Sequence, residues 1–152
     1  MIKFLNSDMR QIYIVGIILI GFLFSGCGDN SPDLISIDEF IEQNNLEVEE
    51  TASGLKYIID NPGSAEKPNI SSIVTVAYVG RRTDALIFDS HQGLRIGLSQ
   101  VIPGWTEGIQ LFGRGGSGTL LIPSPLGYGT RGFGPEIPPN ADLIFDIEVL
   151  DF

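Results

Sequence analysis

The amino-acid sequence predicts an α+β domain in which an antiparallel sheet closes over one central helix. Two observations carry this prediction. Several segments alternate apolar and polar residues with the period of a half-buried strand, most clearly 74–80 and 143–149. Another segment, 103–112, repeats its apolar residues at helical spacing and holds the only tryptophan, Trp105.

The predicted central helix is the element around which the chain is organised. Pro103 suits a first helical turn, because its missing N–H would have no partner there. Trp105, Ile109 and Phe112 then follow at i, i+4 and i+7, which places them on one face. This face is either plain core or, with the apolar pair before the proline, the base of a concave ligand site.

Five strands are predicted from alternation and turn residues. In the last of them Leu143, Phe145, Ile147 and Val149 share one face, and Tyr78 points inward from the second. The predicted strands are 54–59, 74–80, 85–88, 119–122 and 143–149.

The segment 123–140 contains four glycines and five prolines in eighteen residues, so it is predicted to be a loop. A loop of this length is either a binding loop or a flexible linker. Linkers rarely carry aromatic residues, and this one holds Tyr128, Phe133 and Ile137. The composition therefore favours a binding loop.

The composition excludes several classes of protein. A chain of 152 residues with 43% hydrophobic content suits one domain with a single core. The net charge is −10, and residues 28–50 hold eight acidic residues and no Lys or Arg, which argues against a nucleic-acid partner. One Cys and one His exclude a zinc site, a disulfide and a cysteine nucleophile, so we expect no metal and no cofactor.

The N-terminal segment, up to Cys27, is predicted to be a targeting segment. Two basic residues precede an apolar run, 12–24, and the small residues Ser25 and Gly26 lead to Cys27. This layout resembles the lipobox of bacterial lipoproteins, although Phe24 stands where that motif usually has Leu. The alternatives are a buried free cysteine and an uncleaved anchor.

Three parts are therefore expected: a lipoprotein signal peptide at 1–26, a lipidated Cys27 with an acidic tether to residue 50, and a domain at 51–152. The tether includes a candidate short helix, because Ser36 to Glu39 has the form of a capping box. A lipid anchor would place the protein in the bacterial cell envelope, in the periplasm or at the outer membrane.

Blocks across 51–152 resemble the FKBP family of peptidyl-prolyl isomerases, in the family's order. The blocks are 74–80, 88–90, 100–108, 121–123, 128–129, 137–141 and 143–146. The resemblance implies a bent antiparallel sheet of about five to six strands around one short helix. It also implies a prolyl isomerase that assists the folding of exported proteins, with proline-containing polypeptides as partners. Macrolide ligands are candidates, and a monomer is expected.

The resemblance further implies an apolar pocket for a proline ring. Its floor and walls would be Trp105, Tyr78, Phe88 and Phe145. Its rim and cap would be Val101, Ile102, Tyr128 and Ile137. The backbone N–H of Ile102 would bind the ligand, and Asp89 would be a buried carboxylate facing the twisted peptide carbonyl.

The chain also departs from the family. The segment 90–98 is shorter than usual, Leu94 falls where a Phe is common, and the arginine that often partners the pocket aspartate has no counterpart. His91 is expected in a turn, exposed and inert. These departures keep a second hypothesis open, a proline-peptide-binding or chaperone module with little turnover. A purely structural lipoprotein is a third, and it leaves the pocket residues unexplained.

Overall fold

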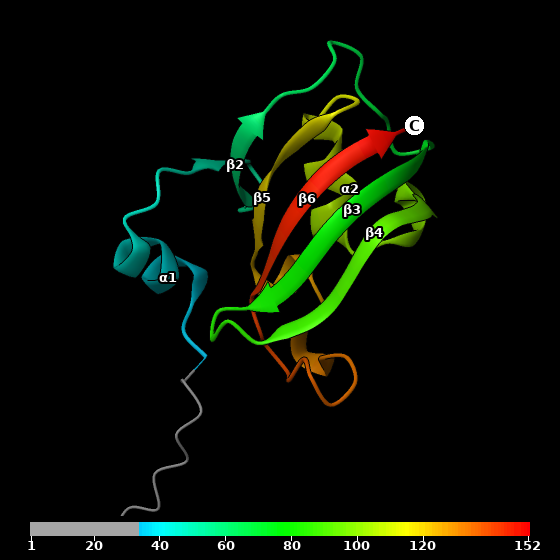
Figure 1. The fold of residues 1–152 in the computed structure, drawn as a ribbon. Coiled ribbons are helices and arrows are strands. Elements are labelled where there is room, and N and C mark those ends of the chain that lie inside the picture. Colours follow the sequence, from blue (N-terminus) through cyan, green and yellow to red (C-terminus); the bar gives the residue numbers. More distant parts are fainter. Residues whose placement is uncertain (1–33) are drawn as a thin grey trace, which may run out of the picture. The chain divides into compact units, whose positions relative to one another are not determined.

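The computed structural model describes residues 34–152 and contains one six-stranded sheet in which every neighbouring pair is antiparallel (Figure 1). The strands are β1 (Glu49–Glu50), β2 (Lys56–Asn61), β3 (Ile73–Arg82), β4 (Ile87–Gly97), β5 (Gly116–Ile122) and β6 (Leu143–Asp151). Their order across the sheet is β1-β2-β5-β6-β3-β4, so β4 forms one edge. The predicted signal peptide and Cys27 lie outside the described residues.

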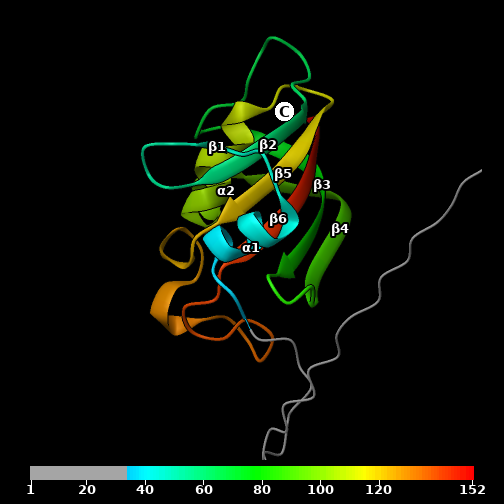
Figure 2. The ribbon, with the colours of Figure 1, turned by 90° about the vertical axis from the view of Figure 1, so that its left-hand side faces the viewer.

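The central helix is α2 (Pro103–Gly108), which lies across one face of the sheet (Figure 2). Pro103 is its first residue, as predicted, but the helix is shorter than the apolar pattern and continues as a 3-10 turn at Ile109–Leu111. Trp105 and Phe112 are nevertheless both buried, so the predicted face is the core face.

Two glycines allow α2 to pack closely on β5. A Cβ built on Gly104 would lie 2.6 Å from Ile122, and one built on Gly108 would lie 2.5 Å from Leu120. Both side chains on β5 are fully buried. The small residues therefore set the distance between helix and sheet, which in turn fixes the height of Trp105 above the strands.

The core fills the space between α2 and the sheet. In β6, Leu143, Phe145, Ile147 and Val149 are buried and Glu148 is exposed, which confirms the alternation predicted from the sequence. This burial contributes roughly 1.5–3 kcal/mol for each large apolar side chain.

Helix α1 (Ile37–Asn44) is preceded by its N-cap residue Ser36, whose hydroxyl accepts a hydrogen bond from the Glu39 N–H. The backbone N–H of Ile37 donates to Asp142 just before β6, at 2.9 Å, and Ile37 itself is buried. Asp38 forms an ion pair with Lys56 at the start of β2.

These contacts place α1 over the sheet face opposite α2 (Figure 2). Leu121 pairs with Ile144 across β5 and β6. Both are fully buried, yet they lie outside the core cluster around α2. Residues 35–38 thus dock on the domain through Thr83, Asp142 and Lys56.

The strand predicted at 85–88 was too short. The observed β4 runs from Ile87 to Gly97 and pairs with β3 along its length, with register shifts near Tyr78 and Gly80. No residue of β4 is fully buried, and six of its eleven residues are exposed, so its sequence lacks the alternation that revealed the other strands. His91 therefore lies in a strand and not in a turn, although it is exposed as expected.

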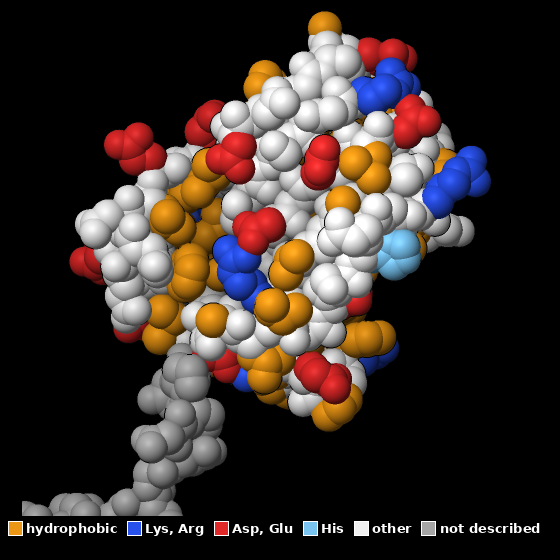
Figure 3. All heavy atoms as spheres, in the orientation of Figure 1, with side chains coloured by type: hydrophobic (Ala, Val, Ile, Leu, Met, Phe, Trp, Pro, Cys, Tyr) orange, Lys and Arg blue, Asp and Glu red, His pale blue; other side chains and the backbone are white. Residues whose placement is uncertain are grey.

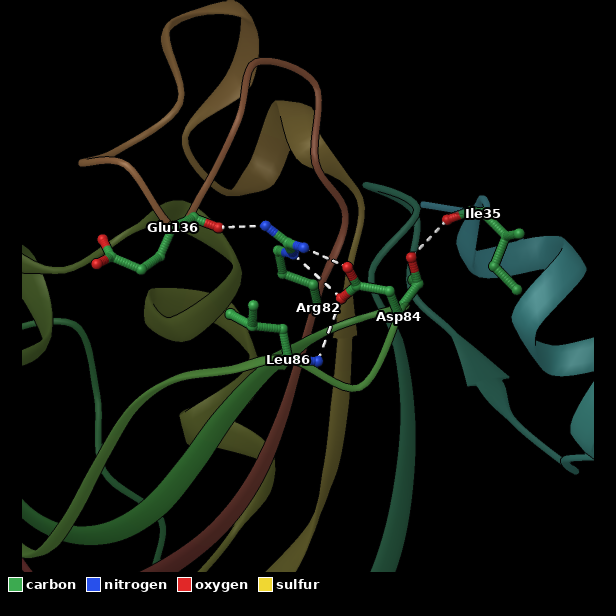
Figure 4. A network of polar contacts seen from close by, with 6 residues as sticks. Ile35, Arg82, Asp84, Leu86 and Glu136 are labelled. Atoms are coloured by element: carbon green, nitrogen blue, oxygen red, sulfur yellow. Dashed lines mark hydrogen bonds and ion pairs between the residues drawn. The ribbon is translucent and has the colours of Figure 1, made fainter. Parts of the chain in front are cut away.

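The segment 123–140 is a loop with short 3-10 turns at Ser124–Leu126 and Gly129–Arg131. Phe133 and Ile137 exchange backbone hydrogen bonds at 2.8 and 3.2 Å. Arg82, at the end of β3, donates to the backbone carbonyl of Glu136 and pairs with Asp84, which ties the loop to the β3–β4 hairpin (Figure 4). The loop is therefore built into the domain.

None of the helices within residues 34–152 combines the length and the apolar content that crossing a membrane requires. Acidic, basic and apolar side chains are interspersed over the face seen in Figure 3, without a gathering of Lys and Arg. That face offers no basic patch of the kind that binds nucleic acid.

Candidate functional site

A cavity of about 370 Å³ opens beside α2, between the helix and the strands β3, β4 and β6. It is lined by Tyr78, Phe88, Asp89, Leu94, Ile96, Gln100, Val101, Ile102, Trp105, Tyr128 and Phe145. Eight of the nine residues expected from the sequence lie in this lining. The ninth, Ile137, lines a smaller hollow next to it.

The floor and walls are aromatic rings packed edge to face. The ring centroids of Tyr78 and Trp105 are 4.9 Å apart with planes at 84°, and those of Trp105 and Phe145 are 5.2 Å apart at 79°. Phe88 meets Phe145 at 5.5 Å and 83°. These edge-to-face contacts are favourable and hold each ring in place. The result is a rigid apolar hollow with preformed walls.

Gly80 makes room for two of these rings. It pairs with Asp89 on β4 and with Phe145 on β6. A Cβ at Gly80 would lie 2.7 Å from the Phe145 ring and 2.8 Å from the Phe88 ring. Both rings therefore lie against bare backbone, and any larger residue here would push them into the cavity.

The indole of Trp105 is 5% exposed and forms the floor. Its Nε1 is buried without a hydrogen-bond partner among residues 34–152. Trp105 is the third residue of α2, and its backbone N–H donates to the Ile102 carbonyl in the first turn of the helix. The helix start therefore fixes both the indole and the rim.

Ile102 supplies a free donor at the rim. It is the N-cap residue of α2, and its carbonyl accepts from Trp105 and Thr106. Its own N–H has no hydrogen-bond partner within the described part of the chain. Val101 and Ile102 are half-buried and line the cavity, so the rim combines apolar surface with an unpaired backbone donor.

Tyr78 and Asp89 form the polar element of the site. The Tyr78 hydroxyl donates to Asp89 Oδ2 at 2.6 Å. Burial and then this hydrogen bond raise the pKa of Tyr78 well above its ordinary value, so the phenol stays protonated. Asp89 was expected to be buried, but it is exposed because it lies within the edge strand β4.

Tyr128 lines the cavity from the loop, half-buried and stacked on Phe133 with centroids 4.9 Å apart and planes at 21°. Burial, followed by the negative charge of Asp89, raises the pKa of Tyr128. The loop thus contributes directly to the cavity, which confirms that it is not a free linker.

Sequence reasoning assigned no role to Ile96, Gln100 or Gly80. Ile96 shares a face of β4 with Leu94, and this i, i+2 spacing is the signal that would have found it. Gln100 lies in a 3-10 turn at Leu98–Gln100, where no pattern marks it.

The chemistry of the lining is that of a binding site for an apolar ring. It contains no Ser, Thr, Cys, His or Lys, and its only titratable residues are Tyr78, Asp89 and Tyr128. Among residues 34–152 there is also no group of three or more His, Cys, Asp or Glu that could hold a metal ion. Fold and cavity together define a small α+β domain with an apolar cavity that is edged by a few polar groups, the form typical of a ligand site.

Comparison with known proteins agrees with this class. The model of the family described as FKBP-type peptidyl-prolyl cis-trans isomerase matches residues 64–150, and the chain belongs to that family. The chain is 44% identical over 119 residues to a probable FKBP-type peptidyl-prolyl cis-trans isomerase, FkpA, of Neisseria meningitidis serogroup B, covering 74% of this chain and 44% of that protein.

Two further relatives extend the comparison. The chain is 42% identical over 102 residues to the outer membrane protein MIP of Legionella longbeachae, covering 64% of this chain and 44% of that protein. The crystal structure of FkpA from Escherichia coli superposes with a TM-score of 0.70 and 40% identity, covering 75% of this chain and 56% of that one. The chain therefore spans less than half the length of the curated relatives named here.

Proposed function

We propose that this chain accelerates the cis–trans isomerisation of Xaa–Pro bonds in exported polypeptides. The observation that carries the proposal is the open cavity above Trp105, walled by rings and edged by the free N–H of Ile102. A proline ring is a compact apolar group that suits such a hollow. Family membership supports the same reaction.

The proposed mechanism needs no covalent step. Rotation about a peptide bond removes amide resonance and has a barrier of roughly 18–20 kcal/mol. The twisted transition state has less charge separation than the planar bond, so a dry apolar cavity favours it over the ground state. Catalysis then consists of binding the twisted form more tightly than the planar one.

The polar atoms would fix the orientation of the substrate. The Ile102 N–H would donate to a carbonyl of the peptide. Tyr128 would cap the cavity, with its hydroxyl toward the bound peptide. The imide carbonyl would face the side of the cavity formed by Asp89. The Asp89 carboxylate accepts a hydrogen bond from Tyr78, which fixes its orientation. Because Asp89 is exposed, its contribution is orientation and not a buried charge.

A protease-coupled assay on a proline peptide tests the activity. The full-length protein at micromolar concentration should raise the isomerisation rate above the uncatalysed rate, while circular dichroism shows it to be folded. A folded protein that leaves the rate unchanged would refute the proposal.

The second candidate is a binding or chaperone module that uses the same cavity without useful turnover. Exposed apolar side chains near the cavity, Phe133 and Ile87, at 63% and 61% exposure, favour this function. Suppression of client aggregation without any acceleration of isomerisation would support it. Trp105→Ala should then abolish the suppression, because the same cavity binds the client.

We further propose that the protein is held at the bacterial cell envelope by a lipid on Cys27. The basic, apolar and small residues before Cys27 support this, and a relative named as an outer membrane protein fits it. In fractionated cells, Cys27→Ser should move the protein from the membrane pellet to the soluble fraction. Retention of this variant in the membrane would contradict the lipid anchor.

A further inference from the structure

A second, smaller hollow lies beside the main cavity. It has a volume of about 110 Å³, and we call it the side cavity. Its lining is Phe88, Asp89, Tyr128, Phe133, Glu136 and Ile137. Phe88, Asp89 and Tyr128 also line the main cavity, so the two hollows share a wall. A group bound in one is therefore next to a group bound in the other.

The side cavity combines aromatic rings with carboxylates. Phe88, Tyr128 and Phe133 contribute rings, and Tyr128 and Phe133 stack into a continuous aromatic wall. Asp89 and Glu136 contribute negative charge. Ring faces attract cations through their quadrupole, and carboxylates form charge-assisted hydrogen bonds with ammonium and guanidinium groups. The lining therefore matches the side chain of a lysine or arginine.

The negative charge of Glu136 is not neutralised within residues 34–152. Its carboxylate forms no ion pair there. The nearby guanidinium of Arg82 donates to the backbone carbonyl of Glu136 and pairs with Asp84, while the Glu136 carboxylate points away from it (Figure 4). Arg131 lines a different hollow with Gly129 and Phe133.

Asp89 has acceptor capacity left. The Tyr78 hydroxyl bonds to its Oδ2, and its Oδ1 forms no hydrogen bond within the described residues. The two carboxylates thus face a cavity that holds no cation of the chain itself.

The loop that carries Glu136 is held in place. The paired backbone hydrogen bonds of Phe133 and Ile137 close a tight turn around it, and Arg82 fixes its carbonyl. Ile137 is 3% exposed and anchors the turn in the core. The backbone of Glu136 is therefore fixed beside the main cavity, which keeps its carboxylate near that cavity.

We propose that the side cavity selects substrates with Lys or Arg immediately before the proline. This inference rests on the proposed function, in which the proline ring fills the main cavity and the imide carbonyl faces Asp89. That carbonyl belongs to the preceding residue, whose Cα lies only about 3–4 Å from that of the proline. Its side chain then enters the side cavity, between the ring wall and Glu136.

Peptide binding tests the inference separately from turnover. Peptides that differ only in Lys, Leu or Glu before the proline are titrated into the full-length protein, with the fluorescence of Trp105, the only tryptophan, as the signal. The Lys peptide should bind more tightly than the Glu peptide. Glu136→Gln should reduce that ratio roughly two- to fivefold, as expected for a partly exposed ion pair.

The net charge of −10 could by itself favour a cationic peptide, so a matched control is needed. Glu148→Gln removes one charge from an exposed site on β6 and should leave the ratio unchanged. Equal affinity for the Lys and Glu peptides, or an equal effect of both variants, overturns the inference. Binding with the predicted preference but no isomerisation would refute the proposed function and leave the inference standing.

Discussion

The hydroxyl of Tyr78 donates a hydrogen bond to the carboxylate of Asp89, with 2.6 Å between the two oxygens. The two residues lie on neighbouring strands, β3 and β4, and both line the main cavity. Tyr78 is buried and Asp89 is exposed, so the bond joins the inside of the site to its edge. It orients the one charged group of the main cavity.

Tyr78→Phe removes this bond and keeps the ring. We expect kcat/KM to fall about tenfold, equivalent to the loss of one hydrogen bond of about 1.4 kcal/mol in the transition state. Because Asp89 is exposed, water replaces the lost donor and the free energy of unfolding should fall by no more than about 1 kcal/mol. Isomerase kinetics and urea unfolding measure the two effects. Unchanged kinetics would show that the bond has no role in catalysis.

Gly80→Ala is predicted to narrow the cavity. The added methyl would meet the rings of Phe88 and Phe145, and such overpacking costs about 1–3 kcal/mol of stability. Displaced rings should lower kcat/KM by roughly ten- to a hundredfold, because small misplacements are costly in catalysis.

Gly93→Ala is the matched control on the neighbouring strand. A Cβ at Gly93 meets nothing within 4 Å, so this variant should change stability by no more than about 0.5 kcal/mol and leave activity unchanged. If Gly80→Ala changes stability and activity as little as Gly93→Ala does, the positions of the Phe88 and Phe145 rings do not depend on Gly80.

Asp142 is predicted to hold α1 and the loop together. Its carboxylate accepts from the Ile37 N–H at 2.9 Å and from the Ser124 N–H at 2.8 Å. Asp142→Ala should lower the free energy of unfolding by about 2–3 kcal/mol and expose the α1 amides to hydrogen exchange. Asp38→Ala removes an exposed carboxylate on the same helix and leaves Lys56 paired with Glu50, so it should cost no more than about 1 kcal/mol. Full protection of α1 in Asp142→Ala would contradict this role.

The Arg82–Asp84 pair predicts a loss of stability in acid. Arg82 lowers the pKa of Asp84, whose side chain is 4% exposed. A lowered pKa in the folded state stabilises the protein above the ordinary Asp pKa of about 3.9, and this stability is lost as the pH falls below that value.

Asp84→Asn isolates this contribution. The variant should be about 2 kcal/mol less stable than the native chain near neutral pH, and the difference should shrink as the pH falls below about 4. Chemical denaturation of the native chain and of the variant across this pH range measures the free energy of unfolding of each. A difference that stays constant with pH would mean that the pair does not stabilise the charged form.

Much of the fold could be predicted from the sequence because most elements are half-buried. Alternation in β6 and the helical spacing at Trp105 report directly which face is buried. The bounds of the edge strand β4 could not be predicted, since none of its residues is fully buried and the pattern is therefore weak. Its polar residues looked like a turn, which misplaced His91. The expectation of a buried Asp89 came instead from the family resemblance.

The functional site, like the fold, could be predicted from the sequence only in part. The aromatic residues of the main cavity were predictable because the resemblance names them, and the structure brings eight of the nine expected residues to one cavity. The role of Gly80 depends on a close approach between β3 and rings from two other strands, which no local pattern records. The separate position of Ile137 depends on how the loop folds back through its bond with Phe133.

Exchange NMR on a proline peptide is the most direct test of the central claim. With a substoichiometric amount of the full-length protein, we predict faster exchange between the cis and trans signals of the peptide. In excess protein, the single indole N–H resonance, that of Trp105, should shift as the peptide binds. A folded protein that leaves both the exchange rate and the indole resonance unchanged would contradict catalysis in the cavity above Trp105.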